Sequence, residues 1–299
     1  MGKIVWYFGG GNTRSIYGSG IVKGIADRMT REELFEKTRC IIAGSGGLVN
    51  VAGLVSGQAE IPGEVCMNDL QEGFVSYWGA INRIFRGFAK KAGMNFEVND
   101  GPNCVEIDQL MKSLRDRGMN YKAVEKCPVP IKGKLFDVKQ MRITYLDLRT
   151  DPERILRQGV SISPYFTSKE DKIDGEALEP LGVEYMLSQM RPEDKLVGVM
   201  NYPPLKGVKH SLKRWLESNV GEEVYPGIGE IISKKDEKFR REVRVIKQLV
   251  KEGRALLSHP PKSDPTRSRT TDRRKLEITY ATGERNSEEI VEFVRNAEN

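Results

Sequence analysis

The chain has 299 residues, of which 38% are hydrophobic and 30% are charged, and its formal net charge is +6 at pH 7. This composition excludes a disordered or low-complexity chain and leaves one large domain or two small ones open. The sequence holds four widely spaced cysteines without a C-x-x-C pair and only two histidines, a set that indicates no metal site. We therefore expect reduced thiols, a cytoplasmic location and no cofactor.

The first predicted unit is a strand, a glycine loop and a helix. Residues 3–8 are rich in Ile, Val and aromatic side chains, residues 9–15 read Gly-Gly-Gly-Asn-Thr-Arg-Ser, and residues 16–28 read as a helix. Such a loop aims backbone N–H groups at an anion, either a phosphate or an oxyanion. The dinucleotide pattern G-x-G-x-x-G fails at Arg14, and the P-loop pattern lacks its Gly-Lys-Ser/Thr. The sequence therefore favours an oxyanion hole, with a plain tight turn as the alternative.

A second glycine turn follows the next predicted strand. After a helix signal at residues 31–37, residues 41–51 read Ile-Ile-Ala-Gly-Ser-Gly-Gly-Leu-Val-Asn-Val. A short apolar strand, a turn and a helix start in this order are typical of a nucleophile elbow, with Ser45 at the positive end of the helix dipole. Residues 40–59 are uncharged over nearly the length of a membrane span, but their glycines and polar side chains indicate a buried strand and helix instead.

The middle of the chain alternates helix and strand signals. Helices are predicted over residues 46–57, 68–92, 106–117 and 151–158, and residues 129–148 read as two strands with the turn at Lys132-Gly133-Lys134. Aromatic side chains interleaved with Arg and Lys at residues 74–94 favour a core helix and leave an interface-seeking helix as the alternative. A turn is predicted at Asp174-Gly175.

The last third adds helix signals at residues 181–190, 209–218, 235–252 and 286–297, a strand at 196–200, and a proline-rich segment at 258–274 that we expect to be flexible. Strands that alternate with helices predict an α/β fold, a three-layer sandwich with a central, mostly parallel sheet. Open sheets of this kind place their active sites at the carboxyl ends of the strands. The two glycine turns are expected at that edge.

The glycine loop, the Ser45 elbow and the Asp174-Gly175 turn together resemble the motifs of the patatin-like phospholipases in order and in spacing. That family has a Gly-Gly-Gly-x-Arg-Gly loop, a G-x-S-x-G elbow and an Asp-Gly-Gly/Ala motif. The resemblance covers about residues 3–201 and continues more loosely beyond. It implies a single patatin-like domain over residues 1–299, with a core at about 1–205 and a basic helical part at about 206–299.

Four positions depart from the family pattern. Asn12 stands at the third loop glycine, Ser15 follows Arg14, Ala43 opens the elbow, and Glu176 follows the Asp-Gly pair. None of these changes removes the expected nucleophile or base. They leave open whether the oxyanion hole uses Gly10 and Gly11 or Gly11 and Asn12, because the loop either carries one extra residue or does not.

The resemblance implies a hydrolase of carboxylic esters in acyl lipids that works without a metal or cofactor. In the implied dyad Ser45 is the nucleophile and forms an acyl intermediate, and Asp174 is the base. Gly47 and Gly175 support the two turns, and Arg14 clamps the glycine loop. Phospholipid, lysophospholipid, galactolipid and neutral glyceride remain open as substrates, because all of them need the same dyad.

The sequence also allows two alternatives to this dyad enzyme, a triad esterase and an inactive lipid-binding protein. The chain order Ser45, Asp174, His210 fits a serine triad, although His210 opens a basic helix that reads as surface. A triad would make the protein an ordinary serine esterase. The other alternative is a protein that keeps the fold, binds lipid and has lost activity, which the altered glycine loop makes conceivable.

Positive charge gathers near the C-terminus. Residues 234–275 hold 15 Lys/Arg against 6 Asp/Glu, a net charge of +9. There an apolar stripe of Phe239, Val243, Ile246 and Val250 lies opposite Arg240, Arg241, Arg244, Lys247 and Lys251. We expect a helix docked on the core whose basic side makes peripheral contact with an anionic membrane. No recognition motif indicates a nucleic-acid partner, and no motif defines the oligomeric state.

Overall fold

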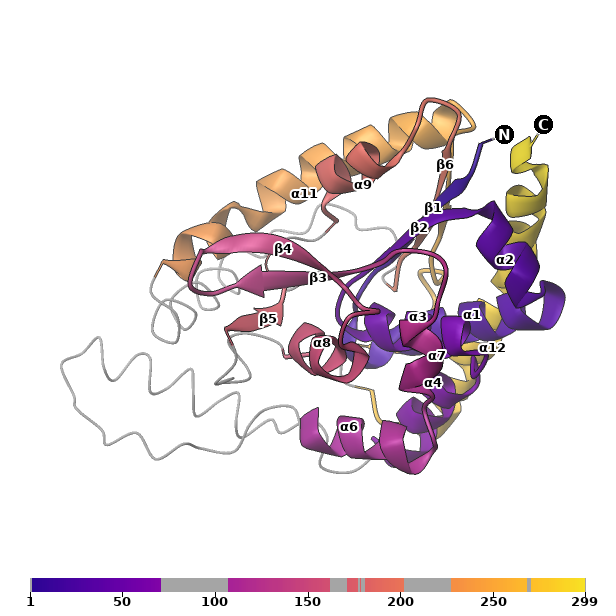
Figure 1. Ribbon diagram of the computed structural model, residues 1–299, viewed down its shortest axis with the longest axis vertical. Coiled ribbons are helices and arrows are strands. Elements are labelled where there is room, and N and C mark those ends of the chain that lie inside the picture. Colours follow the sequence, from indigo (N-terminus) through magenta and orange to yellow (C-terminus); the bar gives the residue numbers. More distant parts are fainter. Residues whose placement is uncertain are drawn as a thin grey trace.

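The computed structural model describes residues 2–70, 107–161, 171–176, 178, 181–201, 227–267 and 270–298. The helix predicted at residues 209–218, and with it His210, lies outside these residues, as does the helix predicted at 68–92 from residue 71 on. The described chain forms a central β-sheet with helices on both faces (Figure 1).

Within the described residues the sheet has seven strands, in the order β4-β3-β2-β1-β6-β7 with β5 also paired to β3. Their bounds are β1 Ile4–Phe8, β2 Thr38–Ala43, β3 Ile131–Asp137, β4 Arg142–Asp147, β5 Lys172–Asp174, β6 Lys195–Val199 and β7 Ala255–Ser258. The pairs β1–β2, β1–β6, β2–β3 and β6–β7 are parallel, whereas β4 and β5 run antiparallel to β3. The predicted α/β fold with a mostly parallel central sheet is confirmed.

The two faces of the sheet are covered by different helices (Figure 1). One face packs against α1 (Ile16–Arg28), α3 (Gly46–Ser56) and α12 (Arg273–Arg295), and the other against α9 (Val183–Gln189) and α11 (Ile228–Lys251). Side chains alternate along β1, so Trp6 and Phe8 join the first core and Val5 and Tyr7 the second. The remaining helical segments are η1 Asn12–Ser15, α2 Arg31–Lys37, α4 Ile61–Glu64, η2 Val65–Asp69, α6 Ile107–Asp116, α7 Tyr121–Glu125, α8 Pro152–Gly159 and η3 Asn296–Glu298.

Helices α1 and α12 approach closely because glycines lie at their contact. A Cβ at Gly20 would lie 2.0 Å from the Tyr280 carbonyl oxygen, and one at Gly283 would lie 2.2 Å from the Tyr17 carbonyl oxygen. Tyr17 Oη also lies 2.7 Å from Ser258 Oγ, at the end of β7. The C-terminal helix therefore packs directly on the first helix of the chain and closes the core on that face.

Two local predictions are wrong. The expected turn at Lys132-Gly133-Lys134 lies inside β3, and the chain reverses at residues 138–141 instead. Lys134 can lie in the strand although it is fully buried, because its ammonium group pairs with the carboxylate of Glu176. The helix expected at residues 286–297 already begins at Arg273.

The C-terminal loop segment is packed rather than loose over its described part. Asp264 and Thr266 are 5% and 1% exposed, and Thr266 N donates to Asp264 Oδ1 at 2.8 Å. Thr279 of α12 donates to the same carboxylate through Oγ1, at 3.0 and 2.9 Å. Within the segment predicted to be flexible, Asp264 and Thr266 are therefore packed against α12.

The uncharged stretch at residues 40–59 forms the end of β2, the turn and α3. All α3 residues from Gly47 to Ser56 are buried inside the molecule, as the sequence predicts. Among the described helices, none is long and apolar enough to cross a membrane.

Candidate active site

Ser45 stands on the sharp turn between β2 and α3. Its backbone has φ 50° and ψ −134°, a combination that residues with a side chain rarely adopt. Gly44 N donates to the Phe8 carbonyl at 3.1 Å, and Gly47 N donates to the Gly44 carbonyl at 2.9 Å. A Cβ at Gly47 would lie 2.3 Å from the Phe8 carbonyl oxygen, so the position takes only glycine. The strand–turn–helix geometry predicted for Ser45 is present.

The glycine loop after β1 lies directly against this serine. A Cβ at Gly10 would lie 2.5 Å from Ser45 Cβ and 3.1 Å from Ser45 Oγ. Asn201 Nδ2 holds the loop by donating to the Gly9 carbonyl at 2.6 Å. Among the described residues, the amides of Gly10 and Gly11 donate no hydrogen bond. The loop thus packs against Ser45 through its backbone at Gly10.

The far end of the loop is anchored to the C-terminal part of the chain. Asn12 adopts φ 54°, and Asn is among the few residues besides glycine that take this left-handed conformation readily. Its presence in place of a third glycine therefore keeps the backbone path. Thr13 Oγ1 donates to the Arg267 carbonyl at 2.9 Å, and Arg14 Nε donates to the Thr266 carbonyl at 3.3 Å. These bonds fit the predicted clamp role of Arg14.

Strand β3 brings Asp174 to the elbow. Its first half pairs with β2, where Ala43 lies opposite Gly133, and its second half pairs with β5, where Asp174 lies opposite Leu135. Asp174 therefore lies just beyond the end of β2, on the same edge of β3. The Ser45 hydroxyl lies near the Asp174 carboxylate there and contributes to the pKa of Asp174. Two side chains far apart in the sequence are thus brought to the same edge of β3.

The Asp174 carboxyl is buried, and its pKa is raised from 3.8 to about 7. Burial is the main cause, and the negative charge of Glu176 adds to it. Three interactions oppose the rise in pKa: hydrogen bonding with the Ser45 hydroxyl, the Glu176 amide that donates to Oδ1 at 2.8 Å, and the positive charge of Lys134. A carboxylate with this pKa is a stronger base than an ordinary aspartate.

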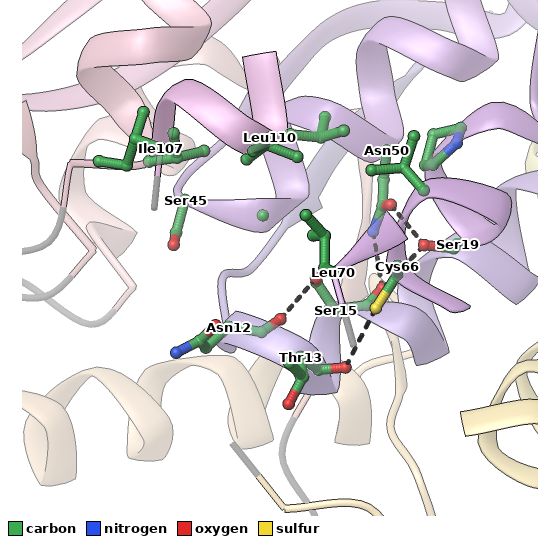
Figure 2. A pocket seen from close by; sticks show the side chains of 15 residues that line it. Asn12, Thr13, Ser15, Ser19, Ser45, Asn50, Cys66, Leu70, Ile107 and Leu110 are labelled. Atoms are coloured by element: carbon green, nitrogen blue, oxygen red, sulfur yellow. Dashed lines mark hydrogen bonds between the residues drawn. The ribbon is translucent and has the colours of Figure 1, made fainter. Parts of the chain in front are cut away.

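A partly open cavity of about 60 Å³ is lined in part by Ser45. Its apolar lining consists of Val49, Pro62, Val65, Leu70, Ile107, Leu110 and Val160. Its polar lining includes Asn12, Thr13, Ser15, Ser19 and Asn50, and in Figure 2 Ile107 and Leu110 lie across the cavity from Asn12 and Thr13. Burial raises the pKa of the Cys66 thiol in this lining to about 12, so the thiol stays protonated and is a poor nucleophile.

Three residues beside the site were not predicted as members of it. Tyr7 Oη donates to Glu176 Oε1 at 2.6 Å, and Lys134 Nζ pairs with Glu176 Oε2 at 2.5 Å. All three side chains are buried. The sequence offered one signal, since Glu176 stands where the resembled family has a small residue. It did not indicate which cation or hydroxyl would meet this carboxylate.

Gly175 is confined by the backbone of β3, and His259 lies close to the carbonyl of the next residue in the chain. A Cβ at Gly175 would lie 2.8 Å from the Leu135 carbonyl carbon, so glycine is required where the chain leaves β5. His259 is half-buried, and its Nδ1 lies 3.2 Å from the Pro260 carbonyl oxygen. In the part of the chain that the structure describes, no group of His, Cys, Asp and Glu side chains could hold a metal ion.

No protein-family model matches this chain, and neither does any curated protein. Among solved structures, it is similar to VipD from Legionella pneumophila, with a TM-score of 0.41 and 10% identity over 96% of this chain and 66% of VipD. It is also similar to the type III effector protein ExoU, with a TM-score of 0.39 and 11% identity over 99% of this chain and 53% of ExoU. The chain thus spans about two thirds of VipD and about half of ExoU.

Proposed function

We propose that this protein hydrolyses carboxylic ester bonds of acyl lipids, with Ser45 as nucleophile and Asp174 as general base. The main support is one observation: a buried carboxyl with a pKa of about 7 lies beside the hydroxyl of the strained elbow serine. An ordinary aspartate is too weak a base to take a proton from serine efficiently at neutral pH, and the raised pKa reduces this mismatch. The motif resemblance to patatin-like phospholipases implies the same pair.

In the proposed acylation step, Ser45 Oγ attacks the ester carbonyl carbon while Asp174 accepts the hydroxyl proton. The oxyanion accepts hydrogen bonds from the glycine loop, and the closeness of Gly10 to Ser45 favours Gly10 and Gly11 over Gly11 and Asn12 as donors. The tetrahedral intermediate then collapses, the ester C–O bond breaks, and the leaving alcohol takes the proton from Asp174.

In the proposed deacylation step, water attacks the acyl group on Ser45 and gives a proton to Asp174. Collapse of this second intermediate releases the fatty acid and returns the proton to Ser45 Oγ. The oxyanion forms twice in this cycle, so the loop amides act in both steps. Loss of one such donor typically costs about 2.7–4 kcal/mol of transition-state stabilisation.

The cavity supports an acyl chain as the group transferred to Ser45. Seven of its lining residues are apolar, and Ser45 lines the same cavity. Small-molecule sites combine an apolar lining with a few polar groups in this manner. Phospholipids, lysophospholipids, galactolipids and neutral glycerides all carry such a chain, and the proposal covers this whole class.

We further propose that the exposed basic side of α11 makes peripheral contact with anionic lipid. Ile232, Ile246 and Leu249 face the core, whereas Arg240, Arg241, Arg244, Lys247 and Lys251 are exposed. Each basic residue near an anionic surface contributes about 1 kcal/mol of attraction. Such contact would bring the protein to its substrate.

A panel of defined lipids tests the proposed activity. We expect Ser45→Ala to lose hydrolysis by about 10⁴-fold or more and Asp174→Asn by about 10²–10⁴-fold. Two matched controls should keep wild-type rates: Ser56→Ala on the same helix as Ser45, and Asp171→Asn just before β5. A fluorophosphonate probe should label wild type and leave Ser45→Ala unlabelled.

The same panel separates the alternatives. A loss of about 100-fold or more in His210→Ala would replace the dyad with a triad. Folded wild-type protein that binds lipid vesicles but neither hydrolyses any lipid nor reacts with the probe would be a binding protein, and the proposed function would be wrong.

A further inference from the structure

A buried cluster of ionisable side chains lies between the sheet and α11, directly beside Asp174. Glu176 is at its centre, two residues after Asp174. Its carboxylate accepts a hydrogen bond from Tyr7 Oη at 2.6 Å and pairs with Lys134 Nζ at 2.5 Å. Lys134 Nζ also lies 5.5 Å from the centroid of the Tyr7 ring. These contacts connect Glu176 to β1 and β3, the strands on either side of β2.

Glu176 also touches both glycine turns of the site. A Cβ at Gly44 would lie 2.9 Å from Glu176 Oε2, and a Cβ at Gly10 would lie 3.0 Å from Glu176 Cγ. The backbone of Glu176 holds Asp174, because its N–H donates to Asp174 Oδ1 at 2.8 Å. One residue thus contacts the elbow, the glycine loop and the proposed base.

We propose that Glu176, fixed by Lys134 and Tyr7, is a positioning residue that holds Asp174 against Ser45 and sets the basicity of the Asp174 carboxylate. This inference rests on the proposed function of the Ser45–Asp174 pair. The Glu176 carboxylate accepts no proton in the proposed reaction, so Glu176 acts only through Asp174, to which its amide donates, and through the two glycine turns.

The charges around the cluster determine the direction of the effect. The carboxylate of Glu176 raises the pKa of Asp174 more than the ammonium of Lys134 lowers it. From α11, Lys235 Nζ donates to the Glu176 carbonyl at 3.2 Å. The other ionisable groups that face the cluster are Tyr7 on β1, Tyr145 on β4, and Lys238 and Glu242 on α11. Glu176 is therefore the anion that acts most strongly on Asp174.

The helix α11 forms the outer side of this cluster. Glu242 of α11 accepts from Gly182 N at 3.2 Å and Val183 N at 3.3 Å, at the start of α9. Burial and the charges of Glu176 and Glu242 raise the pKa of Tyr145. Burial is the largest influence on Lys238 and lowers its pKa. The cluster therefore lies in a desolvated layer, where charges act strongly on one another.

The isosteric variant Glu176→Gln tests the electrostatic part. Removing this negative charge should move the acid limb of kcat/KM against pH to lower pH by roughly one unit. In the absence of substrate, NMR titration of ¹³C-labelled Asp174 should show a shift of the same sign and similar size. If Glu176→Gln leaves both titrations where wild type has them, or moves them upward, the inference is wrong.

Glu176→Ala tests the positional part, because it also removes the packing against both glycine turns. We expect its fluorophosphonate labelling, at a pH above both acid limbs, to be slower than that of Glu176→Gln by about 10-fold or more. Equal labelling rates in the two variants would remove the positional role.

If Glu176→Gln does not fold, because Lys134 loses its counter-ion, the double variant Lys134→Met/Glu176→Gln replaces both charges. We expect a smaller downward shift of the Asp174 titration in this variant, since the effect of Glu176 exceeds that of Lys134. An unchanged or upward shift contradicts the inference. A downward shift of the Asp174 titration in a protein that hydrolyses no lipid would support the effect of Glu176 on Asp174. It would also show that the proposed function is wrong.

Discussion

The face of the sheet beneath α1, α3 and α12 packs mainly apolar side chains, whereas the face beneath α9 and α11 buries ionisable ones as well. In β1 the change occurs between neighbours, because Trp6 points to the first face and Tyr7 to the second. Tyr7 Oη donates to Glu176, which pairs with Lys134. The Glu176 amide in turn donates to the Asp174 carboxylate. The first face thus mainly stabilises the fold, whereas the second carries the side chains proposed to adjust the pKa of Asp174.

The two faces are expected to differ energetically. Burying apolar surface stabilises the folded state by about 25 cal/mol per Å². Burying a charge costs free energy unless a partner compensates it, and a buried ion pair often does no better than apolar side chains of the same size. The face beneath α11 therefore keeps its charges at a cost in stability.

The largest expected effect is a loss of stability on the apolar face. Trp6 is 1% exposed, and its indole N–H donates to Thr38 Oγ1 at 2.9 Å. Trp6→Ala should lower the free energy of unfolding by about 3–5 kcal/mol, equally at pH 5 and pH 8, because no ionisable group titrates with it. Urea unfolding measures this. Ile278→Ala at an exposed position serves as control, and a pH-dependent loss in Trp6→Ala would contradict the separation of the two faces.

A smaller effect of opposite sign is expected at Asp174. Its pKa is about 7 in the folded state against an ordinary 3.8, so the folded state binds more protons between these values and loses stability as pH rises through them. Asp174→Asn should therefore be more stable than wild type at pH 8, by up to about 4 kcal/mol at about 1.4 kcal/mol per pKa unit, with the difference vanishing near pH 4. Urea unfolding of both proteins across this range tests the sign. A variant less stable than wild type at pH 8 would mean that the carboxylate is better compensated than its burial indicates.

The smallest expected effect concerns the outer side of α11, whose inner side carries the charged cluster. Arg244→Ala should weaken binding to phosphatidylserine vesicles by about 1 kcal/mol, and added salt should reduce the difference. Gln248→Ala, one turn further on the same helix and also exposed, is the matched control. Vesicle sedimentation measures both variants. Equal binding of both would assign the basic side of α11 to another role.

Local sequence patterns predicted the strands, turns and helices around the site, but not which of them lie next to one another. The elbow at Ser45 and the loop at Gly9 are readable because close contacts require glycine in both, with the Phe8 backbone at Gly47 and with the Ser45 side chain at Gly10. The pairing of β5 with β3, which carries Asp174 to Ser45, involves residues distant in sequence. The family resemblance implied that Asp174 acts with Ser45, and nothing in the sequence indicated the strand pairing.

The error at Lys134 has the same origin. Two lysines around Gly133 read locally as an exposed turn, whereas in the fold Gly133 lies beneath Ile155 and Leu48, and Lys134 meets Glu176. Charge compensation across the sheet overrode the local signal. The same long-range pairing hid the cluster beside Asp174, because its members come from elements that are distant in sequence.

The bonds from Thr13 and Arg14 to the carbonyls of Arg267 and Thr266 have a consequence for biosynthesis. The ribosome completes the strand and turn around Ser45 long before the segment that anchors the glycine loop emerges. A nascent chain stalled before residue 264 should therefore carry its serine without a fixed loop and react poorly with fluorophosphonate. The proposed activity would then arise only after residues 264–267 have been translated.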